Sequence, residues 1–258
     1  MYPDIDAFGE LEKSARENSY IKIYLDAVKQ NIKLCAERKI EQPTITYKSI
    51  IDEILFSDHP ISWQRIKMLD SSQIDQIAQR LLTEKNTANK EKLLRVFRKH
   101  KFPFGCDLIL KFAKRRKFDD LKEHALRALI YFKDDRVREF ALANLPRTIT
   151  PDFYTDLLIL NYHRDDHRLL SDIARKFTNE HIIHSITGSY IKIYEKNRTA
   201  NCKEPLEILY SKLTCGVCRY KLVKILYDNN ALSEAINNEL KYDSYKETRK
   251  FAQSKIAR

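Results

Sequence analysis

Hydrophobic and polar positions repeat about every 30 residues from near residue 107 to the C-terminus. Each repeat predicts two short amphipathic helices joined by a polar turn. In the clearest unit, Leu121, Ala125 and Leu129 share one face of a predicted helix. The polar turn 133–135 separates this helix from a second predicted helix with its own apolar face. Pro146 ends that second helix, because proline lacks an N–H donor and clashes with the preceding turn.

Residues that can cap a helix mark where the second helix of each unit is expected to begin. Ser244 and Glu247, three residues apart, have capping-box spacing. The first 86 residues are less regular but also helical in pattern, and the clearest helix is expected from Tyr20 to Arg38. The sequence therefore predicts an all-α protein. The expected starts of the second helices are Asp120, Asp152, Asn179, Cys215 and Ser244.

Two segments carry a family resemblance. Asp134-Asp135-Arg136-Val137-Arg138 with Phe140-Ala141, and more weakly Thr248-Arg249 with Phe251-Ala252, resemble the Asp-x-x-Val-Arg-x-x-Ala signature of the HEAT-repeat family of armadillo-like superhelices. The resemblance covers about 150 residues and implies a HEAT-like α-α solenoid. We expect that solenoid over residues 87–258, with residues 1–86 as a helical N-terminal region packed on it.

Composition agrees with a soluble helical protein. Only 4 glycines and 7 prolines occur in 258 residues, as short turns between helices require. No apolar run approaches the roughly 20 residues that span a bilayer, so no membrane association is expected. Residues 1–6 lack a secretory signal pattern, and an odd count of five scattered cysteines makes a poor disulfide framework. We therefore expect a cytoplasmic protein.

Positive charge gathers between Glu91 and Lys117. Ten basic residues stand there against Glu91 and Asp107, giving +8 of the chain's net charge of +11. One interpretation is a solvated surface that complements helix C-termini. The other is a patch that binds phosphate or an acidic protein. The candidate binding residues are Lys92, Arg95, Arg98, Lys99, Lys101, Lys111, Lys114, Arg115, Arg116 and Lys117.

One cysteine motif, Thr214-Cys215-Gly216-Val217-Cys218-Arg219, has the spacing of a redox pair or half a zinc site. Core packing is the preferred interpretation, because helical spacing places both thiols in phase with Leu222 and Ile225. No metal and no cofactor are therefore expected. A zinc site would need further ligands, and the nearby candidates are Cys202, His181 and His184.

Two other histidines, His163 and His167, are expected in a solvated connector between units. Solenoids usually bind partners, and no phosphate-binding glycine loop or nucleophile elbow is visible. We expect a non-enzymatic scaffold for a protein partner, with nucleic-acid binding through residues 91–117 as the alternative. A minor alternative is a DNA glycosylase, since some glycosylases resemble HEAT repeats in scaffold. Those enzymes hold the nucleotide with aromatic residues beside a carboxylate, whereas the one tryptophan here, Trp63, lies outside the clear repeats.

Overall fold

The computed structural model describes residues 7–38 and 49–256, and these form helices and connecting turns without a strand. The chain divides into two compact units, residues 1–48 and 49–258. In the first unit, α1 (Ala7–Ser14) packs against α2 (Ser19–Arg38). The helix expected from Tyr20 to Arg38 is confirmed, and Leu25 is buried as its pattern predicts. The spacing of Ile21, Leu25, Val28 and Ile32 predicts that they share the apolar face of this helix, but Ile32 is 58% exposed.

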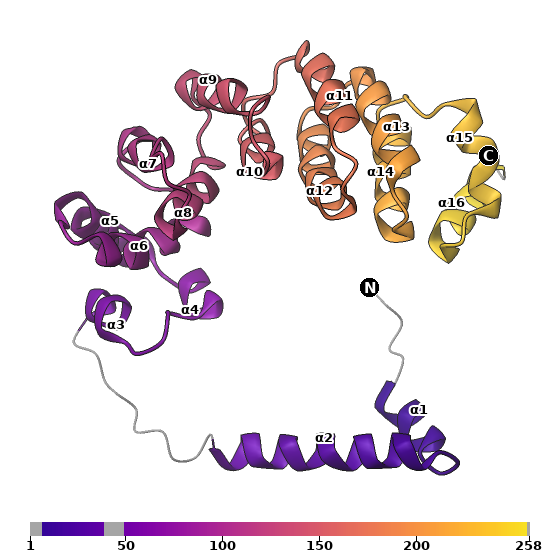
Figure 1. The fold of residues 1–258 in the computed structure, drawn as a ribbon, viewed down its shortest axis with the longest axis horizontal. Coiled ribbons are helices and arrows are strands. Elements are labelled where there is room, and N and C mark those ends of the chain that lie inside the picture. Colours follow the sequence, from indigo (N-terminus) through magenta and orange to yellow (C-terminus); the bar gives the residue numbers. More distant parts are fainter. Residues whose placement is uncertain (1–6, 39–48, 257–258) are drawn as a thin grey trace. The chain divides into compact units, whose positions relative to one another are not determined.

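The second unit contains the helix pairs that the sequence pattern predicts (Figure 1). The second helix of each pair begins within two residues of its expected start, although of the five residues expected at these starts only Asn179 caps its helix through its side chain. In chain order the elements are α3 (Ile50–Phe56), α4 (Trp63–Lys67), α5 (Ser71–Thr83), α6 (Thr87–Leu94), the 3₁₀ turn η1 (Arg95–Arg98), α7 (Asp107–Ala113), α8 (Asp120–Leu129), α9 (Asp135–Asn144), α10 (Pro151–Asp156), α11 (Asp166–Lys176), α12 (Glu180–Lys196), η2 (Ala200–Cys202), α13 (Lys203–Lys212), α14 (Gly216–Asp228), α15 (Glu234–Glu239), η3 (Leu240–Tyr242) and α16 (Lys246–Ile256).

Neighbouring helices pack in two ways. Within pairs, α7 packs on α8, α9 on α10 and α13 on α14. Between pairs, contacts run from α6 to α8, α10, α12, α14 and α16 in succession, and α11 packs on α13. The apolar stripes of the sequence meet in this core, where Leu121, Ala125 and Leu129 are each at most 1% exposed. Burying these stripes supplies most of the stability of short helices, which are marginal alone.

Three asparagines near the ends of successive even-numbered helices add hydrogen bonds between pairs. Asn161 donates through Nδ2 to the carbonyls of Phe132 and Leu157, at 2.9 and 2.8 Å, and its Oδ1 accepts the backbone N–H of Asp134 at 2.9 Å. Asn197 donates to the carbonyls of Ile159 and Ile193, at 2.9 Å each. Asn229 likewise donates within α14 and accepts the N–H of Thr199. These side chains satisfy backbone groups in the turns, which the helices themselves leave unpaired.

Lysines from later helices also satisfy carbonyls at the ends of earlier ones. The Nζ of Lys122 donates to the carbonyl of Arg115 at 2.8 Å, and that of Lys176 donates to Pro146 at 2.7 Å. Lys212 donates to three carbonyls where α11 ends, those of Ala174, Arg175 and Phe177. A cation at a helix C-terminus is favourable because carbonyl dipoles concentrate negative potential there. Part of the basic excess of this chain is therefore structural.

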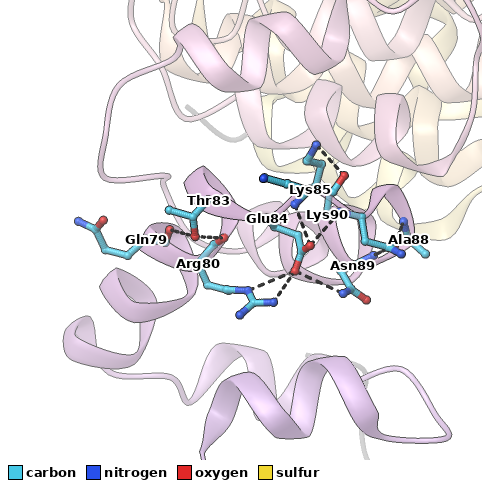
Figure 2. Close-up of polar contacts among 9 residues, drawn as sticks. Gln79, Arg80, Thr83, Glu84, Lys85, Ala88, Asn89 and Lys90 are labelled. Carbon is cyan, nitrogen blue, oxygen red and sulfur yellow. Dashed lines mark hydrogen bonds and ion pairs between the residues drawn. The ribbon is translucent and has the colours of Figure 1, made fainter.

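Residues 49–86 belong to the second unit, because α3 and α5 both pack on α6. The structure thus places a boundary at residue 48, whereas the sequence pattern suggested one near residue 86. Glu84 fixes the turn between α5 and α6 (Figure 2). Its carboxylate accepts two hydrogen bonds from Arg80, one from the Asn89 amide, and the backbone N–H groups of Lys85 and Asn86. This turn leads directly into the basic stretch.

Candidate interaction surface

The first part of the basic stretch is engaged within the fold. Lys92 donates through Nζ to the carbonyl of Leu55, 2.8 Å away at the end of α3. Arg95 donates to the carbonyl of Ile61 at 2.7 Å, and its guanidinium carbon lies 4.3 Å from the centre of the Trp63 ring. Lys92 thus ties α6 to α3, and Arg95 ties η1 to the start of α4, so neither cation is free for a partner.

Two further cations lie near the Trp63 ring. The guanidinium carbon of Arg98 lies 4.9 Å from the ring centre, and the Nζ of Lys99 lies 5.6 Å from it. Such cation–π contacts are favourable, and more so when the charge is partly desolvated. Burial lowers the pKa of both Arg95 and Arg98, and Arg98 also pairs with Glu123 at 3.6 Å. These contacts of Trp63 could not be predicted from the sequence, because Trp63 lies far upstream of the cations that it contacts.

The second part of the stretch is different. Lys111 lies on α7, Lys114 is the C-cap of that helix, and Arg116 and Lys117 follow in the turn. All four are exposed, and none has an ion-pair or hydrogen-bond partner for its side chain among the described residues. Arg115 stands apart, because it is half-buried and donates to Asp119 at 2.9 Å. Lys101 is exposed, with its Nζ 5.4 Å from the Phe132 ring centre. The unpaired charge therefore concentrates on Lys111, Lys114, Arg116 and Lys117, which we call the α7 cations.

A groove of about 570 Å³ lies between α7 and α9, beside the α7 cations. Its apolar members are Leu110, Phe140 and Ala143, of which Leu110 and Phe140 are largely buried. Its charged members mix three cations with two carboxylates. The lining residues are Asp107, Leu110, Lys111, Lys114, Arg136, Glu139, Phe140 and Ala143.

Arg136, in the first turn of α9, lies on one rim of this groove. Arg136 donates to both carboxylate oxygens of Asp134, at 3.0 and 2.8 Å, and also to Asp107. The Arg136 hydrogen bonds hold the pKa of Asp134 well below its usual range. Arg138 makes a two-pronged bond to the buried Asp166, at 2.5 and 2.7 Å, which ties α9 to α11. Both arginines thus position helices, and Arg136 is a fixed part of the rim.

The cysteines lie in different environments. Cys202 is fully buried, and Cys218 is half-buried against the core. Cys215 is also half-buried but occupies the N-cap of α14, with extended backbone angles of φ −71° and ψ 110°. The expectation that both thiols of the motif point into the core is therefore wrong for Cys215. An N-cap residue does not have helical backbone angles. The spacing of residues along the helix therefore does not predict where its side chain points.

The His184 side chain of α12 lies beside the two thiols of this motif. Its Nε2 lies 3.2 Å from the Sγ of Cys218, and both atoms lie within 4.8 Å of the Sγ of Cys215. A backbone hydrogen bond from Cys218, together with the His184 side chain, lowers the pKa of Cys215, whereas burial raises that of Cys218. Cys202 and His181, the other candidate ligands, do not join this group.

His163 lies in the turn before α11, and His167 lies in the first turn of that helix, with its Nδ1 2.9 Å from the carbonyl of Arg164. The connector expected there is observed for His163, whereas His167 is half-buried within α11 and does not belong to the connector. None of the described helices combines the length and the apolar character needed to cross a membrane.

No protein-family model, curated protein or solved structure matches the chain. Its function must therefore be argued from its own residues.

Proposed function

We propose that this chain is a non-enzymatic binding scaffold, built as a HEAT-like solenoid, whose groove between α7 and α9 receives an acidic segment of a protein partner. The observation that carries the proposal is the set of four unpaired α7 cations beside a groove with apolar members. Successive packing of even-numbered helices supports the solenoid, since each pair buries its apolar stripe against its neighbours.

Charge explains why an acidic segment fits. Exposed cations that have no internal partner keep their full field for a ligand, and they steer an oppositely charged partner during encounter. Lys111 and Lys114 reach the groove itself, and Arg116 and Lys117 extend the positive potential beyond the end of α7. In the groove itself, Lys111 and Lys114 lie with two exposed carboxylates, Asp107 and Glu139, and Asp107 is already paired with Arg136.

The apolar members favour a protein over a nucleic acid. Ala143, which is exposed, and the parts of Leu110 and Phe140 that line the groove can contact an aliphatic or aromatic side chain of a peptide, but they offer nothing to a phosphate backbone. Single-strand platforms also stack bases on aromatic rings, whereas Trp63 already has cations over its ring.

Nucleic acid remains the second candidate, favoured by the +8 charge of residues 91–117. The glycosylase alternative is weaker, because it needs an aromatic residue available beside a carboxylate, and Trp63 is engaged by Arg95 and Arg98. We place the scaffold in the cytoplasm, since Cys106, Cys202, Cys215 and Cys218 are free thiols, as a reducing compartment maintains them.

Fluorescence anisotropy tests the class of partner. The probes are a labelled peptide of glutamates and aspartates around a central phenylalanine, the same peptide with glutamine and asparagine, and a single-stranded oligonucleotide of equal charge. The proposal expects the acidic peptide to bind the full chain more tightly than either other probe. Tighter binding of the oligonucleotide, with an affinity that falls steeply and log-linearly with salt, would establish the nucleic-acid alternative instead.

A further inference from the structure

Outside the α7–α9 groove, three side chains that carry metal-binding atoms lie close together. The thiols of Cys215 and Cys218 come from the start of α14, and the imidazole of His184 comes from α12. Their Sγ and Nε2 atoms all lie within 4.8 Å of one another. We propose that these three side chains bind one Zn²⁺ ion, with water as the fourth ligand.

The distances suit a tetrahedral ion without a large rearrangement. Zinc binds thiolate sulfur at about 2.3 Å and imidazole nitrogen at about 2.0 Å. At tetrahedral angles, two such sulfurs lie about 3.8 Å apart, and a sulfur and a nitrogen lie about 3.6 Å apart. The Cys218 sulfur and the His184 nitrogen are already 3.2 Å apart. Insertion of the ion therefore requires these two atoms to separate by only a few tenths of an ångström.

The two helices that supply the ligands are held together by other contacts. α12 packs on α14, and Thr214 donates through Oγ1 to the carboxylate of Glu180, one turn before His184. On the other side of the α14 N-terminus, the backbone of Gly216 approaches Tyr245 so closely that a Cβ atom at Gly216 would lie 2.8 Å from the Cβ of Tyr245. The ligand positions thus rest on packed elements, as a preorganised site requires.

The donor set selects the kind of ion. Two thiolates and one imidazole suit zinc, whereas calcium and magnesium prefer oxygen ligands. The start of a 13-residue helix favours negative charge, so α14 stabilises the thiolate forms that bind metal. His184 is exposed and both thiols are half-buried, so an ion can enter from solvent. A water molecule can then take the fourth position on the exposed side.

Metal titration of the reduced, chelator-treated full chain tests the proposal. Zn²⁺ should bind at one ion per chain in competition with a chromophoric chelator, and Co²⁺ should give the thiolate charge-transfer absorption of a tetrahedral site. Loss of a hydrogen-bonding partner of a zinc ligand costs about 10- to 100-fold in affinity, so loss of a ligand should cost at least that. His184→Ala should therefore bind Zn²⁺ at least about tenfold more weakly, and Cys215→Ser should reduce the Co²⁺ charge-transfer absorption.

The matched control is His181→Ala, which removes the other exposed histidine of α12 and should leave metal affinity unchanged. Since His184 is exposed, its variant should fold even if the cysteine variant does not. Equal Zn²⁺ affinity of the two histidine variants would contradict the proposal. So would failure of the wild-type chain to bind one ion, or formation of a Cys215–Cys218 disulfide by a chain without zinc affinity.

Discussion

Removing the Asn161 amide should weaken the junction between two helix pairs. The side chain is 6% exposed and joins the end of α10 to the turn between α8 and α9. In Asn161→Ala, the carbonyl of Phe132 and the N–H of Asp134 both lose the partner that the amide provides. These groups belong to a turn that the helices cannot satisfy, so the cost falls on the folded state.

The magnitude follows from the two backbone groups left unpaired. Leaving a buried hydrogen-bonding group without a partner costs about 1–3 kcal/mol, and the bond to Leu157 is lost as well. Partial access of water to the Asp134 N–H keeps its cost at the lower end of that range. We expect Asn161→Ala to lower the free energy of unfolding by about 2–4 kcal/mol.

Urea unfolding followed by circular dichroism measures this loss, with the slope of the transition checked for equality between variants. Asn144→Ala is the matched control, because the Asn144 amide donates only to Phe140 within its own helix. That variant should lose less than about 1 kcal/mol. If Asn161→Ala were no less stable than Asn144→Ala, the asparagines would not be holding the pairs together.

Two further predictions concern Glu84 and Gly216. The Arg80 hydrogen bond, followed by that of the Asn86 N–H, lowers the pKa of Glu84 from 4.5 to about 2. The ionised Glu84 carboxylate therefore contributes its full stability above pH 4.5, and this contribution is lost as the pH falls through 2. The difference in free energy of unfolding between wild type and Glu84→Gln should narrow over that pH range. Unfolding measured at a series of acid pH values checks this. Gly216→Ala should destabilise the fold by about 1–3 kcal/mol through its clash with Tyr245. Thermal melts of both variants measure this effect. Gly188→Ala, where a Cβ would meet nothing within 4 Å, should be neutral or stabilising in these melts.

Local patterns predicted the helices well because their causes are local. Asp120 begins α8 and Asn179 caps α12, since capping and amphipathic spacing act within one or two turns. Ser244 was a less accurate choice, because the N–H of Tyr245 bonds to the Asp243 carboxylate instead. The sequence also predicts a new segment that begins at Pro43 and runs through Ile50, Ile51 and Leu55, and its part before residue 49 lies outside the described residues.

The site depended on contacts that local patterns do not contain. Lys92 and Lys111 look alike in sequence, yet Lys92 reaches the carbonyl of Leu55, and Lys111 has no such acceptor among the described residues. The Cys-x-x-Cys motif was visible, but its relation to His184 arises only when α12 and α14 pack together. Which cations stay unpaired, and which thiols meet an imidazole, are properties of tertiary packing.

The charge-reversal test of the α7 cations addresses the central claim most directly. One variant changes Lys111, Lys114, Arg116 and Lys117 to Glu, and the control makes the same change at four exposed lysines of the second unit outside the groove, Lys67, Lys133, Lys203 and Lys224. Both change the net charge equally, so nonspecific attraction falls alike. Dissociation constants for the acidic peptide should rise more than about tenfold in the first variant and about twofold in the control. Equal weakening in two folded variants, or none in either, would contradict binding at the α7–α9 groove.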